Sequence, residues 1–543
     1  MAYIVYKAEN ICNSTAGKKK QLNTWISFMT ILVLIFGWMT NKILGDNILA
    51  LMPTPSPSHH IWNRALILAL ASRGHHITIL TADAEKELHP NYTEILIEGA
   101  YDRIEEAGFN YETMSTYSNI KNSLTWFSWG EDACNYALGT KGAKKLLQLK
   151  GKKHFDLIII DDTVEQCFLS FVSVFNFPPT LTISAYVSPP WANINVGNPQ
   201  MLAYTSTYLL PYSDKMTFME RMNNFIIHNV VILYYTYYHL PAMDNIARKH
   251  LGENIVVPSE ILKEHISLAM VNTHFSLDYP RPNVPAMIQV GGMQVTPARK
   301  LPKDIQKFLD EAKHGAIFFS LGTNVRSDKM SNEKLKAFLD AFSELPQRVL
   351  WKFESDSLPK LPKNVMVNKW LPQNDILGHP NIHLFLSHAG MLSIHEAMYH
   401  GVPIVGMPFI ADQHANIFKL LSHGVAVKLA YINVTKESVL EAIHEVLHNP
   451  SYKENMKKVS VIFRDQPETP LEKAIYWTEY VLRHKGAKHL RARSVDMPLY
   501  QYLLLDVIAV LLIGVISVII LLLFILKTIY RFAFPRNNKK KTQ

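Results

Sequence analysis

The chain has 543 residues, 48% of them hydrophobic and 11% aromatic, which is enough for two domains with packed cores and excludes an intrinsically disordered chain. Its formal net charge of +9 lies at the ends, because residues 1–20 carry +3 and residues 527–543 carry +6. The body between them is neutral, which excludes a nucleic-acid partner and relates the basic charge to membrane topology.

The chain begins with a pattern typical of a secretory signal. Lys18–Lys20 precede the apolar run Trp25–Met39, and Gly45 is a small residue suited to a cleavage point. The run is short for a spanning helix. We therefore expect residues 1–45 to be a signal peptide that is removed, with an uncleaved signal anchor as the alternative.

Residues 46–282 are predicted to form a first domain. A strand at Ile48–Met52, the loop PTPSPSH, a helix at Ile61–Ser72 and a strand at His76–Leu80 make a βαβ unit. Sites in such sheets lie at the carboxyl ends of strands, where this loop places His59. A later buried strand, Leu157–Ile160, ends in Asp161 and Asp162. A histidine beside a carboxylate is a candidate general base with an orienting partner.

Within the first predicted domain lies a region rich in aromatic residues, from Ala185 to Leu251. Such side chains could wall a pocket for a lipophilic ligand or pack between helices.

The three cysteines allow one intramolecular disulfide at most. Cys12 lies upstream of the folded region, so only Cys134 and Cys167 could pair. Since free cysteine packs as a small hydrophobic residue, two buried free thiols are the favoured expectation. No CxxC metal pattern occurs.

Residues 283–490 are predicted to form a second doubly wound domain after a linker at Pro280–Pro285. Its first unit is a strand at Gly315–Ser320, a helix at Asn332–Leu345 and a strand at Val349–Phe353. The turn after the first of these strands contains Ser320, Gly322 and Thr323.

The stretch Trp370–Gln413 alternates strand and helix in the same way. A short strand at His383–Leu386 leads through the small-residue turn Ser387–Gly390 to a helix at Met391–Tyr399, and another strand follows at Pro403–Gly406. The amino end of a helix at the edge of a parallel sheet offers free N–H groups and a positive dipole, so we expect a diphosphate there.

The second long apolar run, Val507–Leu526, is uncharged and matches the hydrocarbon thickness of a bilayer, so it is predicted to be a transmembrane helix. Basic residues follow it and Asp506 precedes it, which places the tail 527–543 in the cytosol and the body across the membrane in a type I topology. Lys540 and Lys541 resemble a dilysine signal for the endoplasmic reticulum. A lumenal body could carry glycans at the sequons of Asn91 and Asn433.

The stretch WLPQNDILGHPNIHLFLSHAGMLSIHEAMYHGVPIVGMPFIADQ resembles the signature of UDP-glycosyltransferases, membrane-bound animal enzymes that transfer a sugar from a UDP-sugar to small lipophilic acceptors. The segments SLGT, RGHHITIL, FDLIIID and the pattern AxxWxEYV at Ala474–Val481 resemble the same family. The resemblance implies an α/β fold with two doubly wound, Rossmann-like domains facing a cleft, the B-type glycosyltransferase architecture, plus the transmembrane helix.

The resemblance also implies which residues do the chemistry. His59 corresponds to the general base and Asp161 to its partner, with His60 and Asp162 as the adjacent alternatives. The residues that would bind the donor fall into three groups. The diphosphate would contact Ser320, Gly322, Thr323, His388, Gly390 and Ser393; the uridine would contact Trp370, Gln373 and Glu396; the sugar would contact Asp412 and Gln413.

The chain departs from the family at two places. Alanine stands at Ala389, where glycine is common, but alanine keeps its N–H and a helix start does not require positive φ, so phosphate binding should survive. Leu392-Ser393 replaces the Asn-Gly of many vertebrate members and is similar to insect members, which mostly use UDP-glucose. We therefore expect glucose as the sugar, with UDP-glucuronate or a non-catalytic sugar-nucleotide-binding membrane protein as alternatives. The UDP-sugar would be a co-substrate without further cofactor or metal, and a homo-oligomer is left open.

Overall fold

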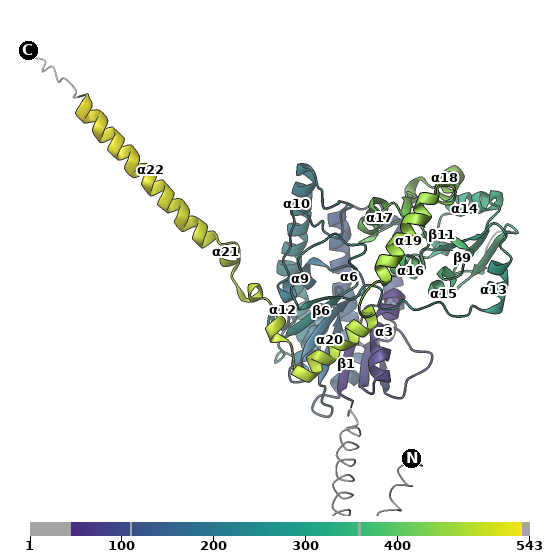
Figure 1. Ribbon diagram of the computed structural model, residues 1–543. Coiled ribbons are helices and arrows are strands. Elements are labelled where there is room, and N and C mark those ends of the chain that lie inside the picture. Colours follow the sequence, from purple (N-terminus) through teal and green to yellow (C-terminus); the bar gives the residue numbers. More distant parts are fainter. Residues whose placement is uncertain (1–44, 109–110, 357–359, 535–543) are drawn as a thin grey trace, which may run out of the picture.

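The computed structural model describes residues 45–108, 111–356 and 360–534, so the predicted signal segment lies outside the described residues apart from Gly45, as does the end of the basic tail. Two separate parallel sheets form the body (Figure 1). The first has the order β3-β2-β1-β4-β5-β6-β7 and the second the order β10-β9-β8-β11-β12-β13. All strand pairs in both sheets are parallel, as expected for two doubly wound domains.

The strands of the first sheet are almost completely buried apart from the edge strand at Tyr92–Leu96, because helices cover both faces of the sheet. They are β1 (Asn47–Met52), β2 (His76–Thr81), β3 (Tyr92–Leu96), β4 (Leu157–Asp161), β5 (Thr180–Ser184), β6 (Ile266–Val271) and β7 (Met287–Gln289). Its helices are α3 (Pro57–Ser72), α4 (Ala100–Glu106), α5 (Tyr111–Met114), α6 (Asn119–Gly139), α7 (Lys141–Leu147), α8 (Phe171–Val174), α9 (Pro190–Val196), α10 (Phe218–Tyr234), α11 (Leu240–Leu251) and α12 (Pro258–Glu264).

The second sheet repeats this plan with a core of its own. Its strands are β8 (Ala316–Ser320), β9 (Arg348–Lys352), β10 (Val365–Asn368), β11 (Ile382–Ser387), β12 (Ile404–Gly406) and β13 (Ala426–Lys428). Its helices are α13 (Lys303–Asp310), α14 (Asn332–Glu344), α15 (Gln373–Leu377), α16 (Met391–His400), α17 (Gln413–Ser422), α18 (Lys436–His448) and α19 (Pro450–Arg464).

The strand order of each sheet reverses at one point. In the first sheet the reversal falls between β1 and β4, and in the second between β8 and β11. Ligands of open parallel sheets bind at such points, outside the carboxyl ends of the strands. The predicted catalytic and phosphate-binding residues lie at the ends of these four strands, in the turns after them or in the first turns of the helices that follow.

Two segments cross between the domains. Strand β7 pairs with β6, so the first sheet continues past residue 282 to Gln289. Helix α20 (Pro470–His484) lies within the range 283–490 but packs on α3, and its Ala474 and Val481 belong to the core of the first domain. Arg73 and Glu479 form an ion pair between the two helices.

The sequence misplaces the start of α3. The helix begins at Pro57 rather than near Ile61, with Ser56 as the preceding cap residue. Proline is favoured at the first helical position because its fixed φ suits the helix and its missing N–H is not needed there. His59 therefore lies in the first turn of α3 and not in a loop.

The expectation of two free thiols is wrong. Cys134 of α6 and Cys167 of the short helix after β4 form a disulfide, with their Cα atoms 6.2 Å apart. Both residues are fully buried in the first-domain core, where α6 packs against this turn. Their 33-residue separation in sequence says nothing about this packing.

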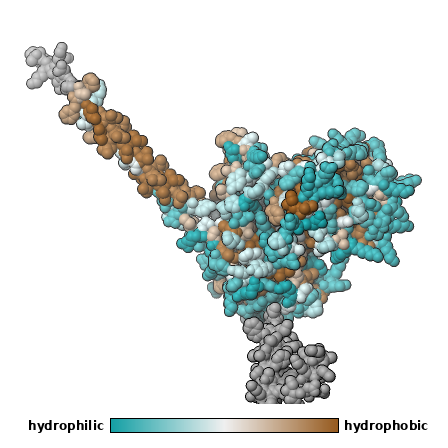
Figure 2. Space-filling view, viewed as in Figure 1, coloured by the Kyte–Doolittle hydropathy of each residue, from teal (hydrophilic) through white to brown (hydrophobic). Residues whose placement is uncertain are grey.

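The predicted membrane segment is a single long helix, α22 (Leu505–Ala533), preceded by the short helix α21 (Leu499–Tyr502). An 18-residue window within it has a mean hydropathy of 3.4 and is not buried in the body, so by length and composition the helix could cross a membrane. Figure 2 shows its hydrophobic surface extending away from the largely hydrophilic body.

Candidate active site

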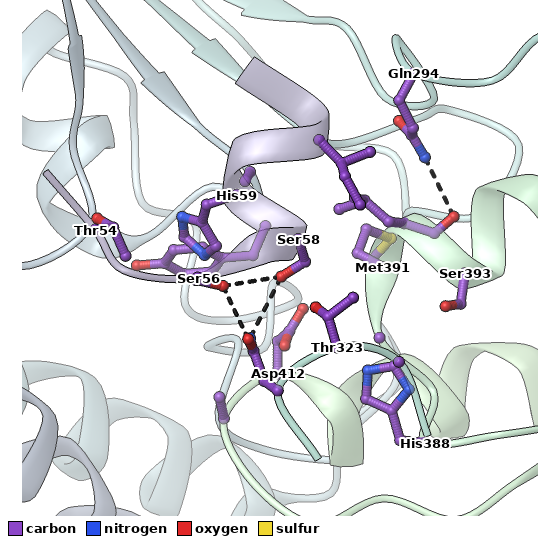
Figure 3. A pocket seen from close by; sticks show the side chains of 18 of the residues that line it. Thr54, Ser56, Ser58, His59, Gln294, Thr323, His388, Met391, Ser393 and Asp412 are labelled. Carbon is purple, nitrogen blue, oxygen red and sulfur yellow. Dashed lines mark hydrogen bonds between the residues drawn. The ribbon is translucent and has the colours of Figure 1, made fainter. Parts of the chain in front are cut away.

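A cavity of about 660 Å³ lies between the two domains, at the carboxyl edges of both sheets. His59 and every residue predicted to bind the donor line it. Ser56 and Ser58 reach across it to Asn324, with hydrogen bonds of 3.1 and 3.3 Å (Figure 3). Residues that are far apart in sequence therefore face one another in a single site.

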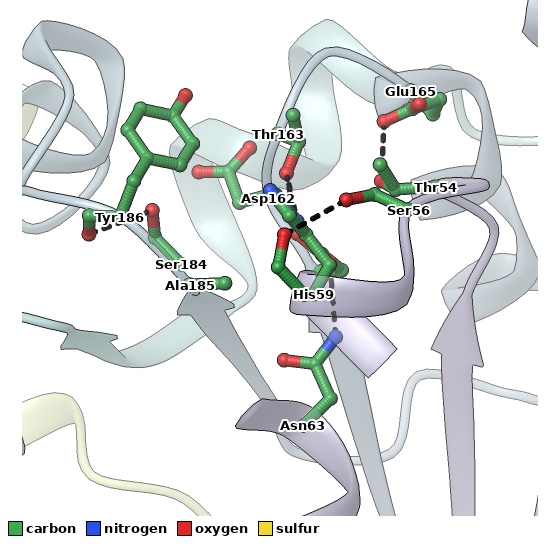
Figure 4. Close-up of polar contacts among 12 residues, drawn as sticks. Thr54, Ser56, His59, Asn63, Asp162, Thr163, Glu165, Ser184, Ala185 and Tyr186 are labelled. Carbon is green, nitrogen blue, oxygen red and sulfur yellow. Dashed lines mark hydrogen bonds and ion pairs between the residues drawn. The ribbon is translucent and has the colours of Figure 1, made fainter. Parts of the chain in front are cut away.

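The predicted catalytic pair is in contact. The Nδ1 atom of His59 lies 3.1 Å from Oδ2 of Asp161, which ends β4 and is 1% exposed. Asn63 and Thr163 donate further hydrogen bonds to this carboxylate, at 2.9 and 2.6 Å (Figure 4). With Nδ1 held, Nε2 is the ring nitrogen available to a substrate hydroxyl.

Opposing effects act on the pKa values of this pair. Burial by itself would lower the pKa of His59, but the charge of Asp161 and their hydrogen bond outweigh it and raise that pKa above 6.5. Burial would raise the pKa of Asp161, but His59 and the donors around it lower it instead. The carboxylate is thus ionised and stabilises a protonated imidazole, as a general base requires.

The adjacent alternatives lie elsewhere. His60 points to Glu85, with Nε2 3.2 Å from the carboxylate. Asp162 accepts hydrogen bonds from Gln166 and Asn195 at 3.0 and 3.1 Å. Burial raises the pKa of Asp162 to about 7. Neither residue contacts the cavity between the domains.

A buried glutamate behind the pair was not anticipated from the sequence. Glu165 is 1% exposed and accepts hydrogen bonds from Thr54 at 2.9 Å and from the N–H of Val164 at 3.1 Å. Burial, and then the charge of Asp161, raise its pKa to about 7. No residue pattern distinguishes it from a surface glutamate, because its burial depends on the packing of the loop after β4.

The imidazole of His388 is held between two glycines at the reversal point of the second sheet. A Cβ atom on Gly322 would lie 2.5 Å from the ring, and one on Gly390 would lie 2.3 Å from it. Burial, and then the charge of Lys352, lower the pKa of His388 to about 4. The ring is therefore neutral at pH 7 and can donate one N–H to an oxyanion.

The expectation about Ala389 is wrong in two respects. Its φ is 63°, in the left-handed region that alanine adopts at a cost of about 1–2 kcal/mol, which explains why glycine suits this position. Its N–H is also not free, because it donates to Oγ of Ser387 at 3.2 Å. The N–H groups available to a ligand are those of residues 391–393, in the first turn of α16. They have no helical partner, because the first hydrogen bond of α16 runs from the N–H of Ile394 to the carbonyl of Gly390.

Three residues predicted to bind the donor are hydrogen-bonded to one another. The amide of Gln373 donates to Oγ of Ser393 at 2.9 Å and to Glu396 at 2.6 Å. Burial raises the pKa of Glu396 to about 7. Trp370 lies beside them with 59% of its side chain exposed, so its ring can stack on a flat base.

Comparison with known proteins identifies the family. A family model described as "UDP-glucoronosyl and UDP-glucosyl transferase" matches residues 48–542. The chain belongs to this UDP-glycosyltransferase family. UDP-glucosyltransferase 2 of Dactylopius coccus is 37% identical over 522 residues, which cover 95% of this chain and 99% of that protein. UDP-glucuronosyltransferase 2B15 of Homo sapiens is 33% identical over 503 residues, covering 89% and 92%.

Solved structures agree with the fold. A UDP-glucose:anthocyanidin 3-O-glucosyltransferase in complex with UDP aligns with a TM-score of 0.54 and 17% identity, over 81% of this chain and all of that one. The glycosyltransferase of kitacinnamycin aligns with a TM-score of 0.53, over 81% and 98%. This UDP-glycosyltransferase therefore has the two-domain architecture of a B-type glycosyltransferase.

The last two predicted residues of the UDP-glycosyltransferase lie at the amino end of α17. Asp412 accepts a hydrogen bond from Asn416 at 2.8 Å, and burial raises its pKa. The side-chain oxygen of Gln413 accepts the N–H groups of Phe409 and Ile410, at 2.8 and 3.2 Å. Only the amide NH₂ of Gln413 is left to bond a ligand.

The cations that line the cavity of the enzyme all have carboxylate partners. Lys352, which the sequence analysis missed, ends β9 near His388 and lies 2.6 Å from Glu354. A lysine at the end of a strand beside the predicted phosphate turns was a signal for it. The other two ion pairs are those of Arg64 with Glu85 at 2.6 Å and of Arg299 with Asp375 at 3.2 Å.

The wall of the cavity beside His59 is aromatic, and the aromatic region supplies both residues that line the cavity and residues that pack behind it. Tyr186, Trp191 and Tyr208 line the cavity, and the ring of Tyr186 is centred 6.0 Å from that of His59. Tyr235 packs behind them, stacked on Trp191 at 5.4 Å.

Within residues 45–108, 111–356 and 360–534, no group of three histidine, cysteine or acidic side chains could hold a metal ion.

Proposed function

We propose that the protein transfers glucose from UDP-glucose to a hydroxyl group of a small lipophilic acceptor, with inversion at the anomeric carbon. The observation that carries the proposal is the position of the His59–Asp161 pair, which faces the donor-binding residues across one cavity. The aromatic wall beside His59 suits an apolar acceptor.

The reaction is a direct displacement. Nε2 of His59 removes the proton of the acceptor hydroxyl as its oxygen attacks the anomeric carbon, and Asp161 stabilises the imidazolium that results. The bond from that carbon to the diphosphate breaks on the opposite face, and UDP leaves with the bonding electrons. The free N–H groups of α16 and the neutral ring of His388 stabilise the negative charge on the diphosphate. We propose that this needs neither cofactor nor metal.

The sugar is proposed to be glucose because the site favours a neutral one. Each cation lining the cavity is already paired with a carboxylate, and Asp412 lies where the sugar is expected. A glucuronate carboxylate there would meet a like charge. The test is to incubate membranes containing the protein with each donor and a panel of phenols. A preference for UDP-glucuronate would overturn this assignment.

The test of catalysis is the variant His59→Ala. Product formation should collapse by a factor of about 10²–10⁴, the usual contribution of a general base, while UDP binding stays unchanged. The matched control is His60→Ala, because His60 is the next residue but bonds Glu85 instead. Unchanged turnover in His59→Ala would refute the mechanism. A wild-type protein that binds UDP but transfers no sugar from either donor would favour the non-catalytic alternative.

We also propose that the protein is a type I membrane protein of the endoplasmic reticulum with its body in the lumen. Helix α22 could span the membrane, and a disulfide such as Cys134–Cys167 forms in an oxidising compartment. Of the two sequons, Asn433 is exposed, whereas the amide of Asn91 donates to the carbonyl of Ala71 at 3.1 Å. Protease added to sealed microsomes should therefore remove only the tail, and digestion of the body would refute this orientation.

A further inference from the structure

Helix α10 is apolar on the side that it does not bury. Its inner side, with Ile227 and Val231, packs into the first-domain core. At about 100° per residue the exposed large hydrophobic side chains fall within an arc of about 120° on the other side. We call these residues the α10 face: Phe218, Met219, Met222, Phe225, Ile226 and Leu233.

The exposure of this face is large for a protein surface. Phe218 is 68% exposed, Phe225 59% and Leu233 54%. The two charged side chains of α10, Glu220 and Arg221, lie outside the arc. Figure 2 shows hydrophobic residues at the upper end of α10. Asn229 is the one polar residue of α10 inside the arc, and its amide donates to the carbonyl of Phe225 at 2.7 Å, so the face is mainly apolar and carries no charge. Such a face marks a contact with another molecule or with a membrane.

The face lies on the side of the body from which the membrane helix leaves. Figure 1 shows α9 and α10 on the side toward α21 and α22. Ser494 donates a hydrogen bond to the carbonyl of Gly197, at the end of α9, at 3.1 Å, and α9 also contacts α10. The eleven residues from Ser494 to Leu505 can span at most about 36–40 Å. The start of α22 is therefore held within reach of α10.

We propose that the α10 face inserts into the interfacial layer of the bilayer that α22 spans, so that the body is held to the membrane at two places. Tyrosine is enriched at membrane interfaces because its ring is apolar and its hydroxyl polar. Tyr237 and Tyr238, just after α10, are both 68% exposed, and Tyr500 and Tyr502, just before α22, are 51% and 45% exposed. This pattern of tyrosines favours a bilayer over a second copy of the chain, and the proposal rests on α22 spanning the membrane.

The proposal brings the membrane close to the acceptor cavity. Tyr235 stacks on Trp191 at 5.4 Å and Tyr234 on Phe127 at 5.6 Å, and both Trp191 and Phe127 line that cavity. One layer of rings therefore separates α10 from the cavity. Lipophilic acceptors concentrate in bilayers, so the enzyme would meet them on this side. Because α10 supports the cavity wall, membrane binding is a better readout than activity.

The test uses the full chain with a protease site inserted after Met497. The protein is reconstituted in phosphatidylcholine vesicles at fewer than one chain per vesicle, then cleaved, and the vesicles are floated in a density gradient. The cleaved wild-type body should float with the vesicles. For the variant Phe218→Ser/Phe225→Ser/Leu233→Ser, the amount of cleaved body in the soluble fraction should be at least ten times that of the wild type. UDP binding by the variant checks that it is folded.

The matched control is Val461→Ser/Ile462→Ser, which changes two apolar side chains of α19 that are 60% and 50% exposed. Its body should float like the wild type. Release of the wild-type body, or retention of the triple variant, would overturn the proposal. Failure of the uncleaved chain to float would instead refute α22 as a membrane span, and retention only at many chains per vesicle would indicate a second copy as the partner.

Discussion

Replacing Asp161 with asparagine tests how the carboxylate acts on His59. The pair is joined at 3.1 Å, and Asp161 is 1% exposed, so its charge is poorly screened. A hydrogen bond to a charged group contributes about 1.5–3 kcal/mol, which corresponds to a loss of about 10- to 150-fold in kcat when the charge is removed. Asparagine keeps the shape, so the change isolates the charge.

The same variant should move the pH profile. The base acts when deprotonated, so the rate rises with pH through the pKa of His59, which Asp161 raises above 6.5. Without that charge, only the smaller effects of Glu165 and Asp412 oppose burial, so the pKa of His59 should fall. The rise of kcat with pH should then shift to lower pH, while the maximal kcat decreases.

The assay is kcat against pH from 5 to 9 with saturating UDP-glucose and a neutral phenol as acceptor. The control is Asp162→Asn, because Asp162 is the adjacent buried carboxyl but contacts Gln166 and Asn195 rather than His59. The control should leave the acid limb in place. The role given to Asp161 would be refuted if Asp161→Asn had the wild-type kcat and the wild-type pH dependence of kcat, with the melting temperature of the wild-type protein.

Three further results are expected. Gly390→Ala places a Cβ atom 2.3 Å from His388, so the ring must move, and the Kd for UDP measured by calorimetry should rise at least tenfold, about 1.4 kcal/mol. Replacing Cys134 and Cys167 together with alanine opens a loop of 33 residues, which should lower the free energy of unfolding in urea by about 4 kcal/mol; no change would contradict the disulfide. Asn433→Gln should abolish a glycosidase-sensitive shift on gels, and a persisting shift would place the glycan elsewhere.

Much of the fold was readable from local pattern. Strands such as β4 and β8 are continuous apolar runs because helices cover both faces of a parallel sheet, and the sequence analysis located both within one residue. The start of α3 was missed because proline occurs both in loops and at the first helical position. The pairing of β7 with β6 was also missed, since a three-residue strand has too little pattern to be recognised.

The candidate site was partly readable because the resemblance runs through short segments with constant spacing. His388 and Glu396 were singled out in this way, and they line the cavity with His59. Glu165 was not singled out, because acidic residues are common and only its burial distinguishes it. Lys352 was missed although its place at the end of a predicted strand was a signal, because basic residues are also common.

The sequence by itself determined the alternation of strands and helices, the apolar membrane helix and the residue types at the turns, because these depend on neighbours a few positions away. Only the tertiary structure decided which residues meet. His59 and Asp161 are 102 positions apart and touch because β1 and β4 are adjacent in the sheet. The bond between Cys134 and Cys167 has the same origin, since it depends on packing between elements that are distant in the chain.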